Sequence, residues 1–370
     1  MYTLDNLKVQ QQIAIELEWA TIPTYATPLY SNGEGCNHEV YELIRSIIMQ
    51  EMLHMVQSAN ILIALNGSPV IDSEHVAPKF PGNLPGYVLP GLNVTLERLS
   101  IRHVHDVLMT IEVPAEFLAT DPPINDTYAY TIGRFYGEIE DCINELNNKG
   151  EISFDTSTDR QVKWPWTPSA QQGDVILIDS VEKAIQGIQL IVSQGEGTDG
   201  VNPFDNANNS LSHFFKFEEI VCQRRLKPIN ETHYSYSGSP IPLNESGVWN
   251  MRNNPNTTIP PHSNCYTNAK NFHHTYRAFL RKLQRVFNGY PDEVMDSVKL
   301  MESLLIHAKS LMWTKYNPAD PDDNTTCGPV WDYEWPEDKP LIAAGSHAQG
   351  LVGRYVPMFL LTMVGSYILL

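Results

Sequence analysis

Basic residues are scarce in this sequence, and charged residues of either sign are few. The 370 residues include 25 Lys and Arg against 43 Asp and Glu, which gives a net charge of −18, and only 18% of the chain is charged. Proteins that bind nucleic acid carry a basic surface for the phosphates. Nucleic acid is therefore excluded as the expected partner, and docking on an anionic membrane is disfavoured for the same reason. The 42% hydrophobic content instead predicts a folded chain with a substantial core.

Cysteines are also few, and none stands close to another. The five are Cys36, Cys142, Cys222, Cys265 and Cys327, without a Cys-x-x-Cys pair or a zinc-finger spacing. An odd, scattered set predicts reduced thiols. The N-terminal segment lacks the basic and apolar regions of a secretory signal peptide, so we expect a cytoplasmic protein.

Motifs for nucleotide binding and for the common hydrolases are absent. The chain has no P-loop, no Gly-x-Gly-x-x-Gly turn after a strand, no Gly-x-Ser-x-Gly elbow and no zinc-protease His-Glu-x-x-His. A dinucleotide-dependent enzyme or a hydrolase is therefore unsupported.

Helical spacing of apolar residues dominates the sequence. It predicts helices over residues 4–22, 38–66, 97–119, 130–148, 179–195, 208–226, 269–288 and 292–314. The first helix is expected to stop at Pro23, because proline cannot donate the next helical hydrogen bond. The Pro- and Gly-rich residues 67–93 are expected to form a loop, and residues 151–176, rich in Thr, Val and Trp, a small β insertion.

These elements predict three regions along the chain. Residues 1–226 form a helical bundle, 227–335 a loop and helical extension packed on it, and 336–370 an irregular segment with an apolar tail. The tail, 355–370, has sixteen residues without a charge. A membrane-spanning helix needs about 20, so we expect this tail to pack on the protein.

One carboxylate lies on the apolar stripe of the first predicted helix. Ile15, Glu18, Ile22 and Tyr25 are spaced 3, 4 and 3 residues apart, which puts them on one helical face. A buried carboxylate is costly unless it is paired, protonated or bound to metal. Alternatively, Glu18 lies at the margin of the stripe and reaches solvent.

The second predicted helix carries an inward carboxylate and an inward imidazole. Glu51 and His54 follow Ile44 and Ile47 on one line. A Glu-x-x-His pair is the ligand motif of four-helix di-iron and di-manganese sites, where other helices supply single glutamates. The motif alone is weak, but together with Glu18 it predicts a metal site.

A second half-site is less complete in the sequence. Glu196 closes one predicted helix, and His213 lies near the start of the next, where it faces inward. The expected glutamate three residues before His213 is replaced by Ser210, which predicts a weaker second metal position. Glu112 shares an apolar line and is a further candidate. As alternatives, Glu196 is a turn carboxylate, His213 a core histidine and Glu112 a capping residue.

The motifs occur in an order that resembles a known family. They are ELEWATIPTY (16–25), QEMLHM (50–55), TIEVP (110–114), IGRFY (132–136), QGEG (194–197), SHFFKF (212–217) and CGPVW (327–331). The sequence is similar to the ferritin-like domain of the iminophenyl-pyruvate dimer synthase family, the imine-coupling proteins of violacein- and rebeccamycin-type pathways. This resemblance covers roughly residues 1–335.

The resemblance implies an iron-containing bundle and an oxidative step on amino-acid-derived imines in secondary metabolism. It also implies that the metal-site residues are Glu18, Glu51, His54, Glu112, Glu196 and His213. The sequence departs from the family pattern at Arg134 and Ser210, where glutamates are usual. The loss of two carboxylates leaves a mononuclear site, a changed metal or a lost activity open.

The sequence thus predicts a mostly α, ferritin-like four-helix bundle with a small β insertion and additional C-terminal helices. The expected function is oxidation of a small amino-acid-derived metabolite by O2 at a non-haem iron site, mononuclear or dinuclear, with manganese as the second choice of metal. A homo-oligomer is compatible with the sequence. The alternative is a non-catalytic metal-binding or scaffold protein with a degenerate second site.

Overall fold

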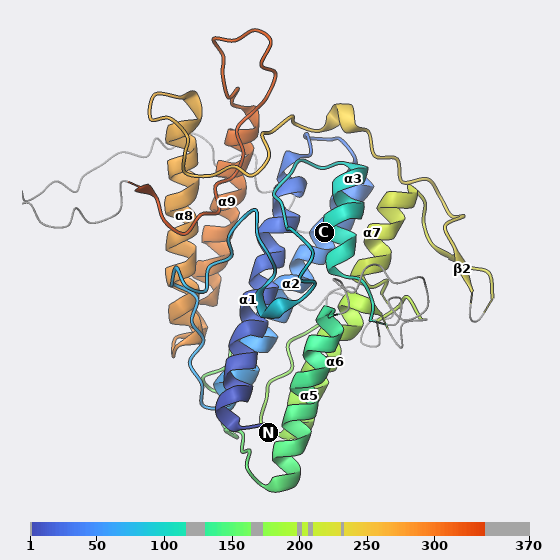
Figure 1. Ribbon diagram of the computed structural model, residues 1–370, viewed down its shortest axis with the longest axis vertical. Coiled ribbons are helices and arrows are strands. Elements are labelled where there is room, and N and C mark those ends of the chain that lie inside the picture. Colours follow the sequence, from blue (N-terminus) through green and yellow to red (C-terminus); the bar gives the residue numbers. More distant parts are fainter. Residues whose placement is uncertain are drawn as a thin grey trace, which may run out of the picture. The chain divides into compact units, whose positions relative to one another are not determined.

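A computed structural model describes residues 2–115, 130–163, 173–197, 202–205, 210–230 and 233–336. Helices make up most of these residues (Figure 1). The apolar tail 355–370, expected to pack on the protein, lies outside the described residues, as does nearly all of the region 336–370. No described helix combines the length and the apolar character that a membrane crossing requires.

Two long helices that pack against each other form the centre of the fold. They are α1 (Leu4–Ser31) and α2 (His38–Ala64). The prediction that α1 stops at Pro23 is wrong, since the helix continues through Pro23 and Pro28. Threonine and serine hydroxyls donate hydrogen bonds to backbone carbonyls on either side of the prolines, as Thr24 does to Ala20 and Thr27 to Pro23, each at 2.8 Å. Tertiary burial of this segment then outweighs the loss of the proline N–H bonds.

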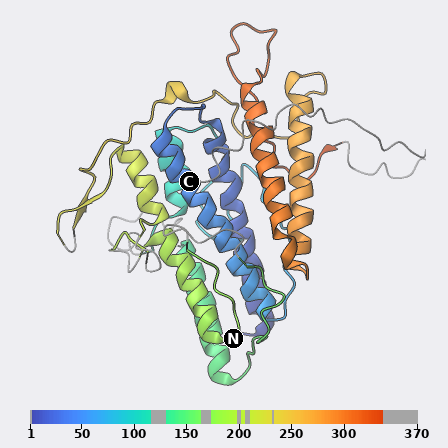
Figure 2. The same cartoon turned by 180° about the vertical axis from the view of Figure 1, so that it is seen from behind.

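The other two members of the bundle are each interrupted along their length. One consists of α3 (Ile101–His103), the π-helical segment η2 (Val104–Met109) and α5 (Ile132–Lys149). The other consists of α6 (Val181–Glu196) and α7 (His213–Cys222). The α5 helix packs on α6, and η2 packs on α7, so the two interrupted members lie side by side (Figures 1 and 2).

The β structure is small and lies elsewhere than expected. Strand β1 (Lys227–Pro228) pairs antiparallel with β2 (Tyr234–Ser235). Residues 151–163 and 173–176 contain no strand, and residues 164–172 lie outside the described part of the chain. Side-chain amides take the place of a partner strand here. Asn60 bonds both backbone groups of Val162, and Gln57 bonds both backbone groups of Ile176, at 2.8–3.1 Å.

Two further helices cover the outer face of α1 and α2. They are α8 (Asn264–Phe287) and α9 (Val294–Trp313), and both contact the central pair. A second apolar core fills this junction, and tryptophans connect its two sides. Trp331 donates to the Thr27 hydroxyl and Trp19 to the Tyr276 hydroxyl, each at 3.0 Å. The remaining helical turns are η1 (Pro85–Tyr87) in the expected loop 67–93, η4 (Glu245–Gly247) and η5 (Pro291–Glu293).

The expectation that all five cysteines are reduced is wrong for two of them. Cys265, at the start of α8, forms a disulfide with Cys327, 62 positions away in the sequence. The fold brings their Cα atoms to 5.8 Å, a separation that spacing along the chain cannot reveal. Cys36, Cys142 and Cys222 are free.

Candidate metal centre

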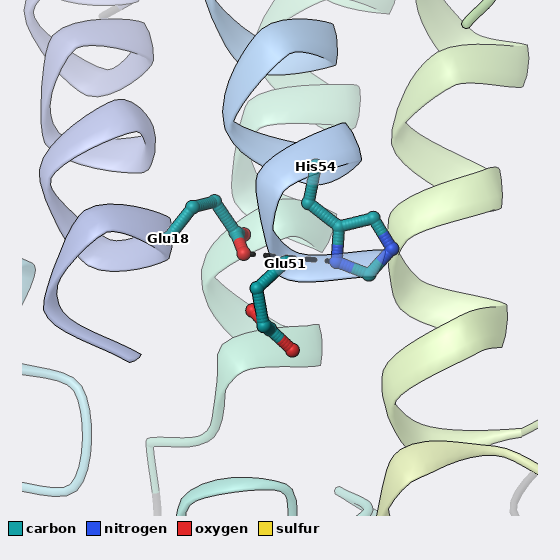
Figure 3. Close-up of side chains that lie close together, drawn as sticks. All are labelled: Glu18, Glu51 and His54. Atoms are coloured by element: carbon teal, nitrogen blue, oxygen red, sulfur yellow. Dashed lines mark ion pairs between the residues drawn. The ribbon is translucent and has the colours of Figure 1, made fainter. Parts of the chain in front are cut away.

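Five of the six predicted site residues lie together in the bundle core. Glu18, Glu51 and His54 form one group of potential ligands, called here the first triad (Figure 3). Glu51, Glu112 and His213 form the second triad. Within each triad the ligand atoms lie within 4.8 Å of one another, and all five side chains are buried. Glu51 belongs to both triads.

The first triad follows from the regular geometry of two helices. Glu18 comes from α1, and Glu51 and His54 lie one turn apart on α2. Figure 3 shows the Glu18 carboxylate directed toward the His54 ring, with Oε2 and Nδ1 3.7 Å apart. The helical i, i+3 spacing alone is sufficient to put Glu51 and His54 on one face.

The second triad depends on the interrupted helices. Glu112 lies three residues after Met109, the last residue of the π-helical segment η2. Short π-helical segments are frequent at functional sites. His213 is the first residue of α7, and short backbone pairing precedes it: Asp205 N donates to Ser210 O at 2.8 Å, and Ser212 N to Pro203 O at 2.9 Å. Because Ser210 belongs to this pairing and not to α7, position 210 is not one helical turn before His213.

Both histidines are oriented by glutamine side chains. His54 Nε2 lies 2.8 Å from Gln194 Oε1, and His213 Nε2 lies 3.1 Å from Gln50 Oε1. An amide oxygen only accepts hydrogen bonds, so each Nε2 carries the proton. Each Nδ1 then presents its lone pair to the triads, which is the form that binds metal.

The three carboxylates also have outer partners. The Tyr136 hydroxyl donates to Glu18 at 2.5 Å, the Tyr25 hydroxyl to Glu112 at 2.5 Å, and the Thr21 hydroxyl to Glu51 at 2.8 Å. Such partners fix the ligating oxygens and are a regular feature of protein metal sites.

The buried carboxylates of the two triads favour a bound cation. Burial and the nearby Glu112 and Glu18 carboxylates raise the pKa of Glu51 well above its ordinary value. Burial lowers the pKa of His213, which favours the neutral imidazole. For Glu112 burial acts upward, but the neighbouring His213, Tyr25 and His54 side chains outweigh it and leave the pKa below the ordinary value.

One close approach tests directly whether a metal fits. His213 Nδ1 and Glu51 Oε1 are 2.8 Å apart and fully buried, yet neither atom takes part in a hydrogen bond. With the proton of His213 on Nε2, the Nδ1 lone pair faces the Glu51 carboxyl group. A proton on that carboxyl or a divalent cation bound by both atoms satisfies this contact, and the Glu/His donor set suits iron, manganese or zinc.

The structure does not bring Glu196 into either triad. Its carboxylate accepts hydrogen bonds from Gly133 N at 2.6 Å and from Ala115 N at 3.2 Å, on the two sides of the interruption before α5. A Cβ at Gly133 would lie only 2.4 Å from Glu196 Oε2, so the approach needs glycine. Arg134, the other departure from the family pattern, is exposed.

Several functional side chains escaped the sequence reasoning. Gln50, Gln194 and Tyr136 orient ligands, and Lys216 is a buried cation near the second triad. All four lie within the sequence motifs that resemble the family. Their polar side chains stand among apolar residues there, and this pattern could have indicated buried polar groups. Tyr25, which shares a predicted helical face with Glu18, donates to Glu112.

Comparisons with known proteins agree with this architecture. The family model for ferritin-like proteins matches residues 11–222, which include all six predicted site residues. A crystal structure of a ferritin-like protein from Caulobacter vibrioides superposes with a TM-score of 0.55 at 22% sequence identity, covering 83% of this chain and 96% of that one. At this identity the likeness concerns the fold alone. None of the curated proteins matches the sequence.

Proposed function

The chain belongs to the ferritin-like family, and on this premise we propose that it is an iron-dependent oxidoreductase that uses O2 to oxidise a small amino-acid-derived metabolite. The observation that carries the proposal is the position of Glu51, whose carboxylate is shared by two buried triads, each completed by one further glutamate and one histidine. Residues of these types in this arrangement would hold two metal ions, as the glutamates and histidines of four-helix carboxylate sites do.

The residues divide into two ligand sets with a common member. Glu18 and His54 would hold a metal with Glu51 in the first triad, and Glu112 and His213 would do so in the second. Two imidazoles beside three carboxylates favour iron, with manganese as the second choice. When bound, iron supplies one-electron redox chemistry and Lewis acidity.

The chain's own contribution is orientation, proton control and exclusion of water. Gln194 and Gln50 hold the proton of each histidine on Nε2. The Tyr136 hydroxyl keeps its proton because burial and the nearby Glu18 raise its pKa well above the ordinary value. The Tyr25 hydroxyl does the same beside Glu112. Both phenols therefore act as fixed donors to the ligating carboxylates.

The substrate class rests on the resemblance and not on the site geometry. Oxidative coupling of amino-acid-derived imines, as part of secondary metabolism, is the reaction we propose first. We propose that neither nucleic acid nor a membrane is a partner of this protein. A homo-oligomer is compatible with the proposal. The Cys265–Cys327 disulfide favours an oxidising compartment over the expected cytoplasmic location, because the cytosol keeps thiols reduced.

A second function is favoured by the small number of carboxylates in the two triads. With three carboxylates where the usual motif supplies four, the chain would bind metal without turnover. Two measurements separate the possibilities. Iron per chain is determined for the wild type, Glu51→Ala and His54→Ala, and oxygen uptake is followed after Fe(II) loading with amine, imine and keto-acid substrates.

We expect iron in the wild type, its loss in both variants, and oxygen uptake with at least one substrate. Folded variants that keep the wild-type iron content would overturn the metal assignment. Bound iron without oxygen uptake on any substrate would favour the non-catalytic function.

A further inference from the structure

We propose that Lys216 makes the second triad the weaker, exchangeable metal position, by holding a fixed positive charge one helical turn from His213. This inference rests on the proposed metal-binding function and concerns a residue outside both triads. It assigns the two metal positions different affinities and an order of filling, with the first triad occupied before the second.

The geometry places the lysine directly behind a ligand. Lys216 follows His213 by three residues on α7, so the two side chains share one face of the helix. The Lys216 ammonium donates to Gln50 Oε1 at 2.8 Å, and the same oxygen lies 3.1 Å from His213 Nε2. Only 5% of Lys216 is exposed. A buried ammonium and the imidazole ligand therefore share one acceptor atom.

The lysine is a cation under ordinary conditions. Burial lowers its pKa to about 8, and the Asp205, Glu51 and Glu112 carboxylates act against that decrease. At pH 7 the side chain thus keeps most of its charge. Its hydrogen-bond acceptor is the neutral Gln50 amide, and within the described part of the chain no carboxylate forms an ion pair with it.

Among the described residues, no lysine or arginine forms a hydrogen bond or ion pair with Glu18 or His54. The outer partner of His54 is the neutral amide of Gln194, and that of Glu18 is the Tyr136 hydroxyl. The second triad differs because Lys216 adds a positive charge one helical turn from His213. A divalent cation is therefore repelled at the second triad more than at the first.

A metal titration of the full-length, metal-free chain tests this inference. Mn(II) is added stepwise, free Mn(II) is measured by its EPR signal, and bound metal is checked by equilibrium dialysis. We expect two steps in the wild type whose dissociation constants differ by at least about tenfold. In Lys216→Met the second step should tighten by on the order of tenfold, because a dication no longer meets a neighbouring unit charge.

Three further variants separate charge from structure. Lys216→Gln keeps a hydrogen-bond donor for Gln50 without the charge and should behave like Lys216→Met. If one of these two variants does not fold, the other still tests the effect of the charge. Lys216→Arg keeps the charge and should retain the wild-type gap. Lys183→Met removes a lysine that pairs with Asp179 at the start of α6, and should also leave the gap unchanged.

The outcomes against the inference are distinct from failure of the proposed function. The role of Lys216 would be overturned if the wild type bound both metal ions with equal dissociation constants. It would also be overturned if Lys216→Met and Lys216→Gln changed both dissociation constants equally. Metal binding itself would remain established in either case. A wild type that binds no Mn(II) and no Fe(II) would overturn the proposed function itself.

Discussion

Replacing Glu51 by the isosteric glutamine should have opposite effects on the metal-free and metal-loaded protein. Two like charges 4.8 Å apart, the outer limit for the ligand atoms of a triad, repel by about 3.5 kcal/mol at an effective dielectric of about 20. Glu51 shares a triad with Glu18 and with Glu112. Partial protonation already relieves some of this repulsion, so we expect Glu51→Gln to stabilise the metal-free fold by about 1–3 kcal/mol.

The metal-loaded protein should respond in the other direction. A ligand at a hundred times its dissociation constant stabilises the native state by about 2.7 kcal/mol. Glu51→Gln removes the carboxylate common to both triads, so Fe(II) or Mn(II) should no longer raise its melting temperature. Calorimetry with chelator and with metal, together with metal analysis, measures both effects.

A matched control is available on α7. Glu219 is also a buried glutamate, but it accepts from Arg225 Nη1 at 2.8 Å and from Leu226 N at 2.7 Å. Glu219→Gln should therefore lower the melting temperature and leave metal content unchanged. If metal-free Glu51→Gln melts below the wild type, or if it still binds metal at the wild-type ratio, the electrostatic reasoning fails.

The same substitution predicts a change in pH dependence. Because the pKa of Glu51 is raised in the fold above its ordinary 4.5, the native state holds this proton to higher pH than the unfolded chain. Its contribution to stability is then fully present below pH 4.5 and is lost as pH rises through the folded pKa. The free energy of unfolding of the metal-free wild type, minus that of Glu51→Gln, should fall with increasing pH in urea titrations, and a flat difference would contradict the shift.

Three other predictions concern the surroundings of the site. Gln194→Leu and Gln50→Leu should each weaken metal binding by about 10–100-fold in dialysis while circular dichroism stays unchanged, because the histidine tautomers lose their partners; unaltered affinity would refute the orienting role. Glu196→Ala should lower the free energy of unfolding by about 1–3 kcal/mol per unsatisfied N–H and keep its metal, whereas metal loss without destabilisation would restore Glu196 as a ligand. Reduction of the Cys265–Cys327 disulfide should lower stability by about 2–4 kcal/mol, measured by melting with and without dithiothreitol, and an equal melting temperature would show that the bond carries no constraint.

The sequence was informative where one helix decides the outcome. The inward positions of Glu18, Glu51 and His54 follow from the regular spacing of α1 and α2, which is a local property of each helix. The α5 and α6 helices likewise lie close to their predicted bounds.

The predicted secondary structure is wrong where side chains from distant segments supply the hydrogen bonds of the backbone. Pro23 does not end α1, because buried hydroxyls and tertiary contacts support the helix there. In the described parts of the expected β insertion, 151–163 and 173–176, no strand forms, and Val162 and Ile176 bond the amides of Asn60 and Gln57. These contacts join residues about 100 positions apart, beyond the range of any periodic pattern.

The sequence by itself therefore determined the fold class and one half of the candidate site. Only the tertiary structure decided that Glu112 and His213 join Glu51, that Glu196 instead braces the start of α5, and that Cys265 meets Cys327. The physical reason is that the second half-site lies at two helix interruptions. Their positions are set by hydrogen bonds between different segments, and not by the spacing of residues along one helix.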